Sequence, residues 1–316
     1  MKDIAGEVMS PTRVMHTFMG KPGFLLARIN QIYVALNAGT GSGETPTQAE
    51  ALLLLGAAGR RDQVSLARAL GLDTSTTALV LSNLEARGVV AREADPADRR
   101  RMAVRLTAAG RRQLAGVRAA FLEVQSRLIE PLGVTEARSL KQMLRRIGAN
   151  PGSPAQPWVP EEGAADTGAG MVTGSLGFLC RRALQVSEAY FISCTQALNL
   201  TPRQFSALFI ARCCPLLSQA EFSRIFGLDP ATSALIMKNL AARGLLDRRV
   251  SSADRRARLH SLTSTGQKLI EDAQPLVDRS ENLVLHDLSR AETVKLVSLL
   301  QEIVAAHRDQ LAFPGS

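Results

Sequence analysis

The chain of 316 residues contains one pattern twice, with a constant offset of 156 residues between the two copies. Similarity at a fixed period indicates two copies of one structural unit. We therefore expect two similar domains, each with its own hydrophobic core. The matched positions are Thr45-Pro46 and Thr201-Pro202, Arg87-Gly88 and Arg243-Gly244, Asp98 and Asp254, Leu106-Thr107 and Leu262-Thr263, Gly110 and Gly266, and Glu136 and Glu292.

Each copy predicts several helices and one β-hairpin. In the first copy a short helix over 65–70 ends at Gly71, and a second helix begins after Asp73, a natural N-cap. Two helices joined by a glycine turn form a helix-turn-helix. Behind it, β-branched residues, the turn residues Asp95 and Pro96, and the alternation over 102–106 predict a hairpin, which makes the unit a winged helix. The second copy places the same elements at 219–226, 228–244 and 245–262.

A long helix follows each hairpin, over about 107–131 and 263–288. Apolar residues recur in it near the seven-residue period, which predicts a seam against another helix. The fold class is therefore mainly α with small β-hairpin wings (α+β), as tandem winged helix-turn-helix domains with a helical platform. The seam residues are Leu114, Val117, Phe121, Val124 and Leu128 in the first copy, and Ile270, Val277 and Val284 in the second.

The domain boundaries follow from composition and from the repeat. We predict an arm over 1–22, a first domain over 23–147, a linker over 148–175 and a second domain over 176–310. The linker is rich in Gly, Pro and Ala and contains acidic residues but no Lys or Arg. The formal net charge of +9 therefore belongs to the arm and the two domains. Residues 1–20 are expected to extend the first domain as a packing arm.

Composition excludes several other classes of protein. No apolar run approaches the ~20 residues of a membrane span, and the N-terminus does not resemble a secretory signal. Cys180, Cys194, Cys213 and Cys214 have neither disulfide nor metal-site spacing, so a cytoplasmic location fits best. No histidine cluster predicts a metal, no glycine loop predicts a bound phosphate, and no nucleophile has a recognisable context, so we expect neither cofactor nor enzymatic activity.

The positive charge favours a polyanionic partner, and the helix-turn-helix favours double-stranded DNA. The N-terminal end of the second helix of such a motif faces base edges, and a wing carries cations to the adjacent backbone or minor groove. The simpler interpretations are capping hydroxyls and a solvated charged loop. The predicted DNA contacts are Thr74, Ser75, Thr76, Thr77, Ala231, Thr232, Ser233 and Lys238 on the two helices, and Arg99, Arg100, Arg101, Arg255, Arg256 and Arg258 on the two wings.

These motifs resemble the MarR family of bacterial transcription regulators. The resemblance rests on Leu-Gly-Leu-Asp at 70–73, Asn-Leu-Glu-Ala-Arg-Gly at 83–88, and Asp-x-Arg followed by Leu-Thr-x-x-Gly at 98–110, each with a counterpart in the second copy. It implies a helical dimer platform and two winged helices that bind a pseudo-palindromic site. It also implies that Asp98 and Asp254 orient Arg100 and Arg256 for insertion into the minor groove.

The chain departs from the family because ordinary members are homodimers of single-repeat chains. A linker of nearly thirty residues can span tens of ångströms, so the two repeats can pair within one chain. We expect an intramolecular pseudo-dimer, with further dimerisation left open. Because the second helices differ between the copies, we also expect an asymmetric operator.

MarR relatives commonly release DNA when a small, often aromatic, ligand binds between the platform and the winged helix. The resemblance implies a repressor of this kind, with Arg28, Tyr33, Arg181 and Tyr190 as candidate ligand contacts, although these residues also suit core packing. Two alternatives stay open: redox sensing through a cysteine, and winged helices that dock proteins without reading DNA.

Overall fold

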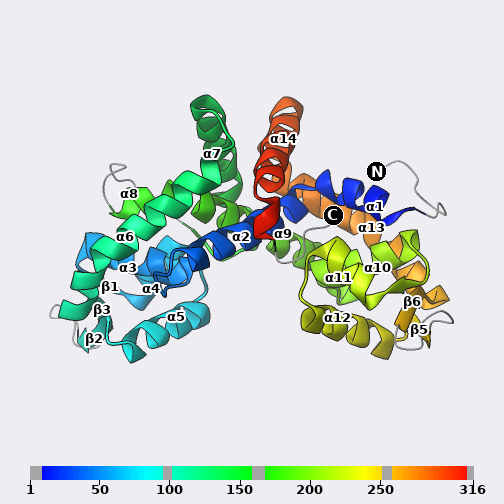
Figure 1. Ribbon diagram of the computed structural model, residues 1–316, viewed down its shortest axis with the longest axis horizontal. Coiled ribbons are helices and arrows are strands. Elements are labelled where there is room, and N and C mark those ends of the chain that lie inside the picture. The colour runs from blue at the N-terminus through cyan, green and yellow to red at the C-terminus, as the bar shows by residue number, and fades with distance from the viewer. Residues whose placement is uncertain (1–8, 95–101, 159–167, 251–257, 312–316) are drawn as a thin grey trace. The chain divides into compact units, whose positions relative to one another are not determined.

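The computed structural model describes residues 9–94, 102–158, 168–250 and 258–311 (Figure 1). Its α-helices, strands and 3₁₀ helices occur in the following order: α1 (Pro11–Met19), α2 (Pro22–Gly39), α3 (Pro46–Ala58), β1 (Arg60–Asp62), α4 (Gln63–Leu70), α5 (Thr74–Ala86), β2 (Val90–Ala94), β3 (Met102–Leu106), α6 (Ala108–Ile129), α7 (Val134–Gly148), α8 (Gly168–Thr173), α9 (Leu176–Thr195), η1 (Gln196–Leu198), α10 (Pro202–Cys213), β4 (Leu217–Ser218), α11 (Gln219–Phe226), α12 (Pro230–Ala242), β5 (Leu246–Val250), β6 (Arg258–Leu262), α13 (Ser264–Leu285), α14 (Arg290–Ala306) and η2 (Arg308–Gln310).

The chain divides into two compact units, each containing one winged helix. The first unit lies within Leu26–Val186 and Ser298–Ala306, and the second lies within Met1–Leu25, Ser187–Val297 and His307–Ser316. Helices α2, α9 and α14 each contribute residues to both units. No helix among the described residues is long and apolar enough to cross a membrane.

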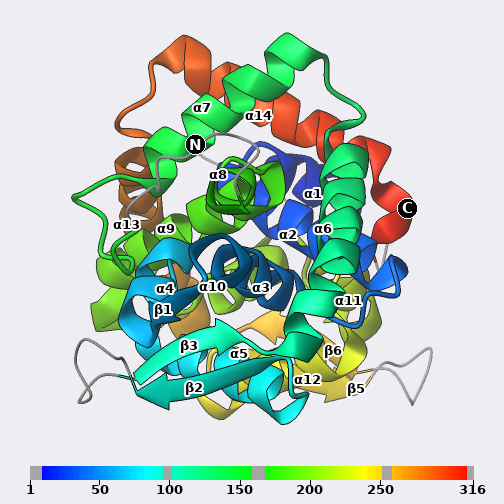
Figure 2. The same cartoon turned by 90° about the vertical axis from the view of Figure 1, so that its left-hand side faces the viewer.

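Both units contain the predicted helix-turn-helix and hairpin. In the first unit, β2 and β3 form an antiparallel hairpin that β1 joins, with the strand order β1-β3-β2. Figure 2 shows this hairpin beside α5. The second unit repeats the arrangement with the order β4-β6-β5. The predicted fold class, mainly α with small hairpin wings in tandem winged helices, is confirmed.

The glycine turn of each helix-turn-helix has a backbone reason. Gly71 and Gly227 end α4 and α11 at φ 63° and 61°, a left-handed conformation that disfavours a side chain. Asp73 and Asp229 then cap α5 and α12 by accepting hydrogen bonds from the first turn. Because these signals are local in the chain, the sequence predicted both motifs at the observed positions.

The recurring Leu-Thr-x-x-Gly motif joins each long helix to the residues just before β2 or β5. The Thr107 hydroxyl donates to the Gly88 carbonyl at 2.7 Å, and the Thr263 hydroxyl donates to the Gly244 carbonyl at 2.8 Å. A Cβ at Gly110 would lie 2.1 Å from the Val89 carbonyl oxygen. The equivalent Cβ at Gly266 would lie 2.2 Å from the Leu245 oxygen. The glycines therefore let α6 and α13 pack directly on backbone.

The N-terminal arm differs from our expectation. Instead of extending the first winged helix, Met9, Val14 and Phe18 join the core cluster of the second unit. The Met9 amide donates to the Cys213 carbonyl at 2.7 Å, and the rings of Phe18 and Phe209 meet edge to face at 5.6 Å. Apolar contacts far apart in sequence decide this placement, and no local signal indicates them.

Part of the predicted linker packs as structure in the first unit. Helix α8 lies close to α3. The approach is so close at Gly168 that a Cβ there would lie 2.5 Å from the Leu53 carbonyl oxygen. Trp158 is 5% exposed and its ring centroid lies 5.4 Å from that of Phe178. These glycines and apolar residues therefore serve packing as well as spacing.

Candidate nucleic-acid interface

The first turn of α5 presents a row of exposed hydroxyls. Thr74, Ser75 and Thr76 are exposed, and the Asp73 carboxylate accepts from the Thr76 amide at 2.7 Å and from its hydroxyl at 2.6 Å. These bonds from Thr76 lower the pKa of Asp73, so the cap is ionised at neutral pH. The helix dipole makes this end attractive to phosphate.

The structure contradicts two of the predicted DNA contacts, Thr77 and Ser233. Both side chains are fully buried, so neither offers surface to a base edge. The Thr77 hydroxyl donates to the Asp73 carbonyl at 2.8 Å. Position 77 belongs to the buried stripe of α5 with Leu81 and Leu84, which follows the helical spacing.

The start of α12 presents a different surface. Ala231 is exposed and Thr232 is half-buried, and the Thr232 amide donates to Asp229 at 2.9 Å. Lys238 is exposed two turns further along the helix. The second unit thus offers a methyl group and an ammonium group where the first offers Ser75 and Ser82.

Two glutamines fix the helix-turn-helix angle, and sequence reasoning did not single them out. The Gln63 side chain donates to the Thr74 carbonyl at 3.0 Å, and the Gln219 side chain donates to the Pro230 carbonyl at 3.1 Å. Each bond links the first residue of one helix to the first residue of the next. Their recurrence at the offset of 156 was the available signal.

The two exposed leucines on these helices were also missed. Leu79 is 63% exposed and Leu235 is 58% exposed, and they occupy equivalent positions on α5 and α12. An apolar side chain on a recognition helix can contact the methyl group of thymine in a major groove. The exposed faces therefore combine hydroxyls with one aliphatic group.

The predicted tips of both wings lie outside the described residues. This applies to Asp98, Arg99, Arg100, Arg101, Asp254, Arg255 and Arg256. The described part of the second wing carries exposed Arg248, Arg249 and Arg258. Of these only Arg258 was predicted, because it lies beside the basic turn at 254–256 in the sequence, whereas Arg248 and Arg249 lie several residues before that turn. In the first wing Arg105 pairs with Glu93 at 2.6 Å.

The residues that were predicted to contact a ligand are buried, and Tyr33 and Arg181 form hydrogen bonds inside the protein. In the first unit, the Glu50 carboxylate is fully buried and accepts from Arg181 at 2.7 Å and from the Tyr33 hydroxyl at 3.2 Å. Arg181 also donates to the Leu70 carbonyl at 3.1 Å. Arg28 is likewise buried, as is Tyr190 in the second unit.

The buried network has electrostatic consequences. Burial raises the pKa of Glu50, an effect that Arg181 opposes by charge and hydrogen bonding. Burial and the neighbouring Glu50 raise the pKa of Tyr33 well above its usual range. These three groups therefore form a closed polar contact between α2, α3 and α9 rather than an open cleft.

Cys180, Cys213 and Cys214 are poor candidates for redox sensing. Burial raises the pKa of Cys180 and of Cys213, and burial together with Cys213 raises that of Cys214 to about 11. A thiol reacts with oxidants as its thiolate, so these three side chains are chemically quiet at neutral pH. Among the described residues, no group of three or more His, Cys, Asp and Glu side chains could hold a metal ion.

Comparison with known proteins identifies the family. The MarR family model matches residues 45–102 and 200–257. The HTH-type transcriptional repressor NicR of Pseudomonas putida is 31% identical over 133 residues, which cover 42% of this chain and 84% of NicR. This chain belongs to the MarR family.

Two solved structures are also similar to less than half of the chain. BpsR of Bordetella bronchiseptica, whose DNA binding is regulated by 6-hydroxynicotinic acid, is 29% identical and covers 44% of this chain and 94% of its own, with a TM-score of 0.39. The transcriptional repressor CouR, bound to a 23-mer DNA duplex, is 29% identical and covers 44% of this chain and 96% of its own, with a TM-score of 0.41. The two family matches in this MarR chain confirm the tandem repeat.

Proposed function

We propose that this MarR-family chain is a transcription repressor that binds one double-stranded DNA operator with both of its winged helices. The observation that carries the proposal is the pair of capped helix N-termini. In each unit an ionised aspartate orders the first turn of α5 or α12, and that turn exposes short side chains suited to a major groove. NicR, the relative with 31% identity, is named a repressor.

The two winged helices are proposed to act as an intramolecular pseudo-dimer on an asymmetric operator. The exposed residues of α5 are Thr74, Ser75 and Thr76, whereas those of α12 include Ala231 and Lys238. A hydroxyl can pair with several base edges, but a lysine ammonium favours the acceptors of guanine. The two half-sites should therefore differ in sequence.

The wings are proposed to supply the sequence-independent part of the affinity. Exposed Arg248, Arg249 and Arg258 support this role in the second unit. Arg99, Arg100, Arg101, Arg255 and Arg256 remain proposed contacts from sequence, with Asp98 and Asp254 as the groups that orient Arg100 and Arg256. Each arginine that neutralises a phosphate should add about 0.9 to the slope of log affinity against log salt.

A DNA titration by fluorescence anisotropy tests the proposal, with the promoter fragment upstream of the chain's own gene. Replacing Arg248 and Arg249 together by alanine should weaken binding and lower the salt slope by about 2. Arg118→Ala, an exposed arginine on α6, is the matched control and should leave both quantities unchanged. Unchanged affinity and slope in the double variant would remove the wing from the interface.

Half-site identity is tested with the same assay on symmetrised operators. The wild-type chain should bind the natural fragment more tightly than a symmetrised copy of either half. Equal affinity for all three fragments would contradict the asymmetric operator. Sizing of the complex in solution tests the pseudo-dimer, which requires one chain per operator, whereas two chains would overturn it.

Release from DNA by a small effector is the remaining part of the proposed function and follows from the family resemblance. A winged helix that only docked proteins would not show a steep loss of DNA affinity with salt. The DNA titration therefore also distinguishes DNA binding from protein docking. We propose no enzymatic role for the chain.

A further inference from the structure

Leu79 on α5 and Leu235 on α12 are exposed apolar residues at equivalent positions of the two repeats. Each side chain is more than half exposed. Among the large apolar side chains that are exposed in the described parts of the chain, these two are the only pair separated by the repeat offset of 156 residues. A single exposed leucine is ordinary on a protein surface, but one that recurs at the same place of two helix-turn-helix motifs indicates contact with a partner.

The two leucines lie on the exposed face of their helices, one turn beyond the first exposed turn. Residues four apart share a helix face, so Leu79 follows Ser75 and Leu235 follows Ala231 on that face. All four side chains are exposed. A helix rises about 6 Å over four residues, which is close to two base-pair steps of about 3.4 Å each. Each leucine therefore lies where a helix in a major groove contacts base edges.

The backbone beneath each leucine is held by hydrogen bonds within the motif. The Gln63 and Gln219 side chains tie the first residues of α4 and α11 to the first residues of α5 and α12. The face of α5 opposite Leu79 is buried through Leu81 and Leu84. Because the helix is already fixed in place, little ordering is needed when the leucine meets a base.

The polar neighbours of the two leucines differ between the repeats. The Ser75 hydroxyl both donates and accepts hydrogen bonds, so it suits either a carbonyl or an amino group on a base. The equivalent residue Ala231 has no polar group in its side chain. Three residues after the leucines, Ser82 of the first repeat corresponds to Lys238, which only donates. The leucine is therefore an apolar feature that both helices share although their polar neighbours differ.

We propose that Leu79 and Leu235 each bind the C5-methyl group of one pyrimidine in the half-site of their helix. The ligand class is a 5-methylpyrimidine, which is thymine in ordinary DNA and 5-methylcytosine in methylated DNA. An apolar side chain in the major groove recognises this methyl group because it is the apolar group that a base pair presents there. The inference rests on the proposed function, since it requires both helices to lie in major grooves of one operator.

This recognition gives the two half-sites one common feature although the operator is asymmetric. Thymine and 5-methylcytosine differ in their hydrogen-bonding groups but carry the same methyl group, which uracil and cytosine lack. Burial of one methyl group against a leucine corresponds to about a 4-fold change in affinity. DNA binding should therefore respond to cytosine methylation at that position as well as to exchange of thymine for uracil.

Fluorescence-anisotropy titration of the full chain tests the proposal with operator duplexes that differ by single methyl groups. The probe is the shortest promoter fragment that the chain binds, synthesised with uracil in place of one thymine at a time. At one thymine in each half-site, the wild-type chain should bind the uracil duplex about 4-fold more weakly. At the same position, a duplex with 5-methylcytosine should bind about 4-fold more tightly than a duplex with cytosine.

Leucine variants assign each methyl group to one side chain. Leu79→Ala should bind the thymine and uracil duplexes equally at one half-site and keep the difference at the other, and Leu235→Ala should show the reverse. Leu79→Met should keep both differences, because methionine retains an apolar side chain of similar volume. Both leucines are exposed and alanine favours a helix, so the variants should fold like the wild type, which thermal unfolding checks.

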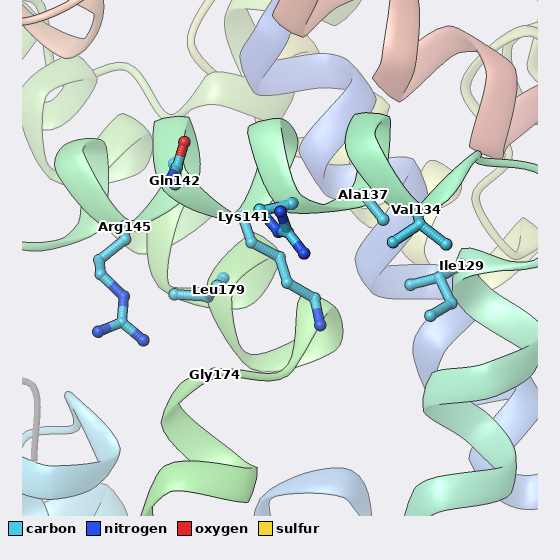
Figure 3. Close-up of a pocket in the computed structure, with 9 residues that line it drawn as sticks. Ile129, Val134, Ala137, Lys141, Gln142, Arg145, Gly174 and Leu179 are labelled. Carbon is cyan, nitrogen blue, oxygen red and sulfur yellow. The ribbon is translucent and has the colours of Figure 1, made fainter. Parts of the chain in front are cut away.

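Val134→Ala is the control for removal of an exposed apolar side chain elsewhere. Val134 is 79% exposed and lies outside both helix-turn-helix motifs, at the start of α7. Figure 3 shows it near Ile129, with which it lines a pocket. Its replacement should leave both thymine–uracil differences unchanged.

The failure of this inference differs from the failure of the proposed function. Equal binding of all thymine and uracil duplexes by the wild type would overturn methyl recognition and leave DNA binding standing, as would equal binding of the cytosine and 5-methylcytosine duplexes. Unchanged discrimination in both alanine variants would overturn the role of the leucines. A chain that binds none of the promoter duplexes would overturn the proposed function, and the inference with it.

Discussion

Replacing Arg181 by methionine should destabilise the first unit strongly. Glu50 is fully buried, and Arg181 is its only cationic partner among the described contacts, at 2.7 Å. Methionine keeps much of the length and apolar stem of arginine but leaves the carboxylate without a counter-charge. Removing one member of a buried ion pair typically costs about 3–5 kcal/mol.

The destabilisation caused by Arg181→Met should depend on pH, because Glu50 can lose its charge by binding a proton. Burial already raises its pKa in the wild type, and loss of Arg181 raises that pKa further. A raised carboxyl pKa in the folded state contributes stability that is present at low pH and lost as pH rises through the folded value. The variant should therefore lose more stability at pH 7.5 than at pH 5.

A second replacement should restore much of the loss. With Glu50→Leu added to Arg181→Met, no buried charge remains, and such apolar pairs are often neutral relative to the ion pair. Recovery should stop short of complete, because Arg181 also satisfies the Leu70 carbonyl at 3.1 Å, and a buried acceptor without a partner costs about 1–3 kcal/mol. Tyr33→Phe, which removes the weaker bond at 3.2 Å, is the mild control.

Urea unfolding followed by tryptophan fluorescence measures these changes. Trp158 is the single tryptophan of the chain and packs on Phe178 in the first unit, so its signal reports that unit. The same penalty for Arg181→Met at pH 5 and pH 7.5 would refute the buried carboxylate as its cause. A double variant no more stable than the single one would refute it as well.

Three further predictions concern the framework. Gly110→Ala should cost about 1–3 kcal/mol or more in unfolding experiments, because its Cβ would lie 2.1 Å from a carbonyl oxygen, whereas Gly116→Ala on the same helix meets nothing within 4 Å and should be neutral or stabilising. Burial, with some help from a nearby arginine, lowers the pKa of His260, so stability should fall as pH drops below about 6.5. That fall is at most about 1.4 kcal/mol per pH unit, and His260→Val, which copies buried Val104 of the first repeat, should remove it in melts at pH 5 and 7. Pro275 is exposed inside α13, so Pro275→Ala should stabilise the second unit by about 1–3 kcal/mol in urea unfolding, and a loss of stability would show that the proline fits its helix.

The elements that could be predicted from the sequence depend on local signals. The caps at Asp73 and Asp229 and the stops at Gly71 and Gly227 act within a few residues of their own positions. Such signals act without tertiary context, and each of them occurs twice, in two copies that are 156 residues apart. The helix-turn-helix, the hairpins and the two long helices were therefore predictable.

Helical rotation decided which hydroxyls face outward. Thr76 and Thr77 are neighbours of one residue type, yet Thr76 is exposed and Thr77 is buried. One residue turns the side chain by about 100° around a helix with 3.6 residues per turn. The spacing of Thr77, Leu81 and Leu84 contained this information, but polar residue type outweighed it in the prediction.

The sequence by itself determined the repeat, the winged helices and the capped turns, because these depend on residues close together in the chain. Only the tertiary structure decided that the arm packs with the second unit and that Arg181 of the second repeat completes the buried network of Glu50 in the first unit. Each of these contacts joins residues far apart in the chain. Their energy comes from burial and from paired charges in three dimensions, which no local pattern records.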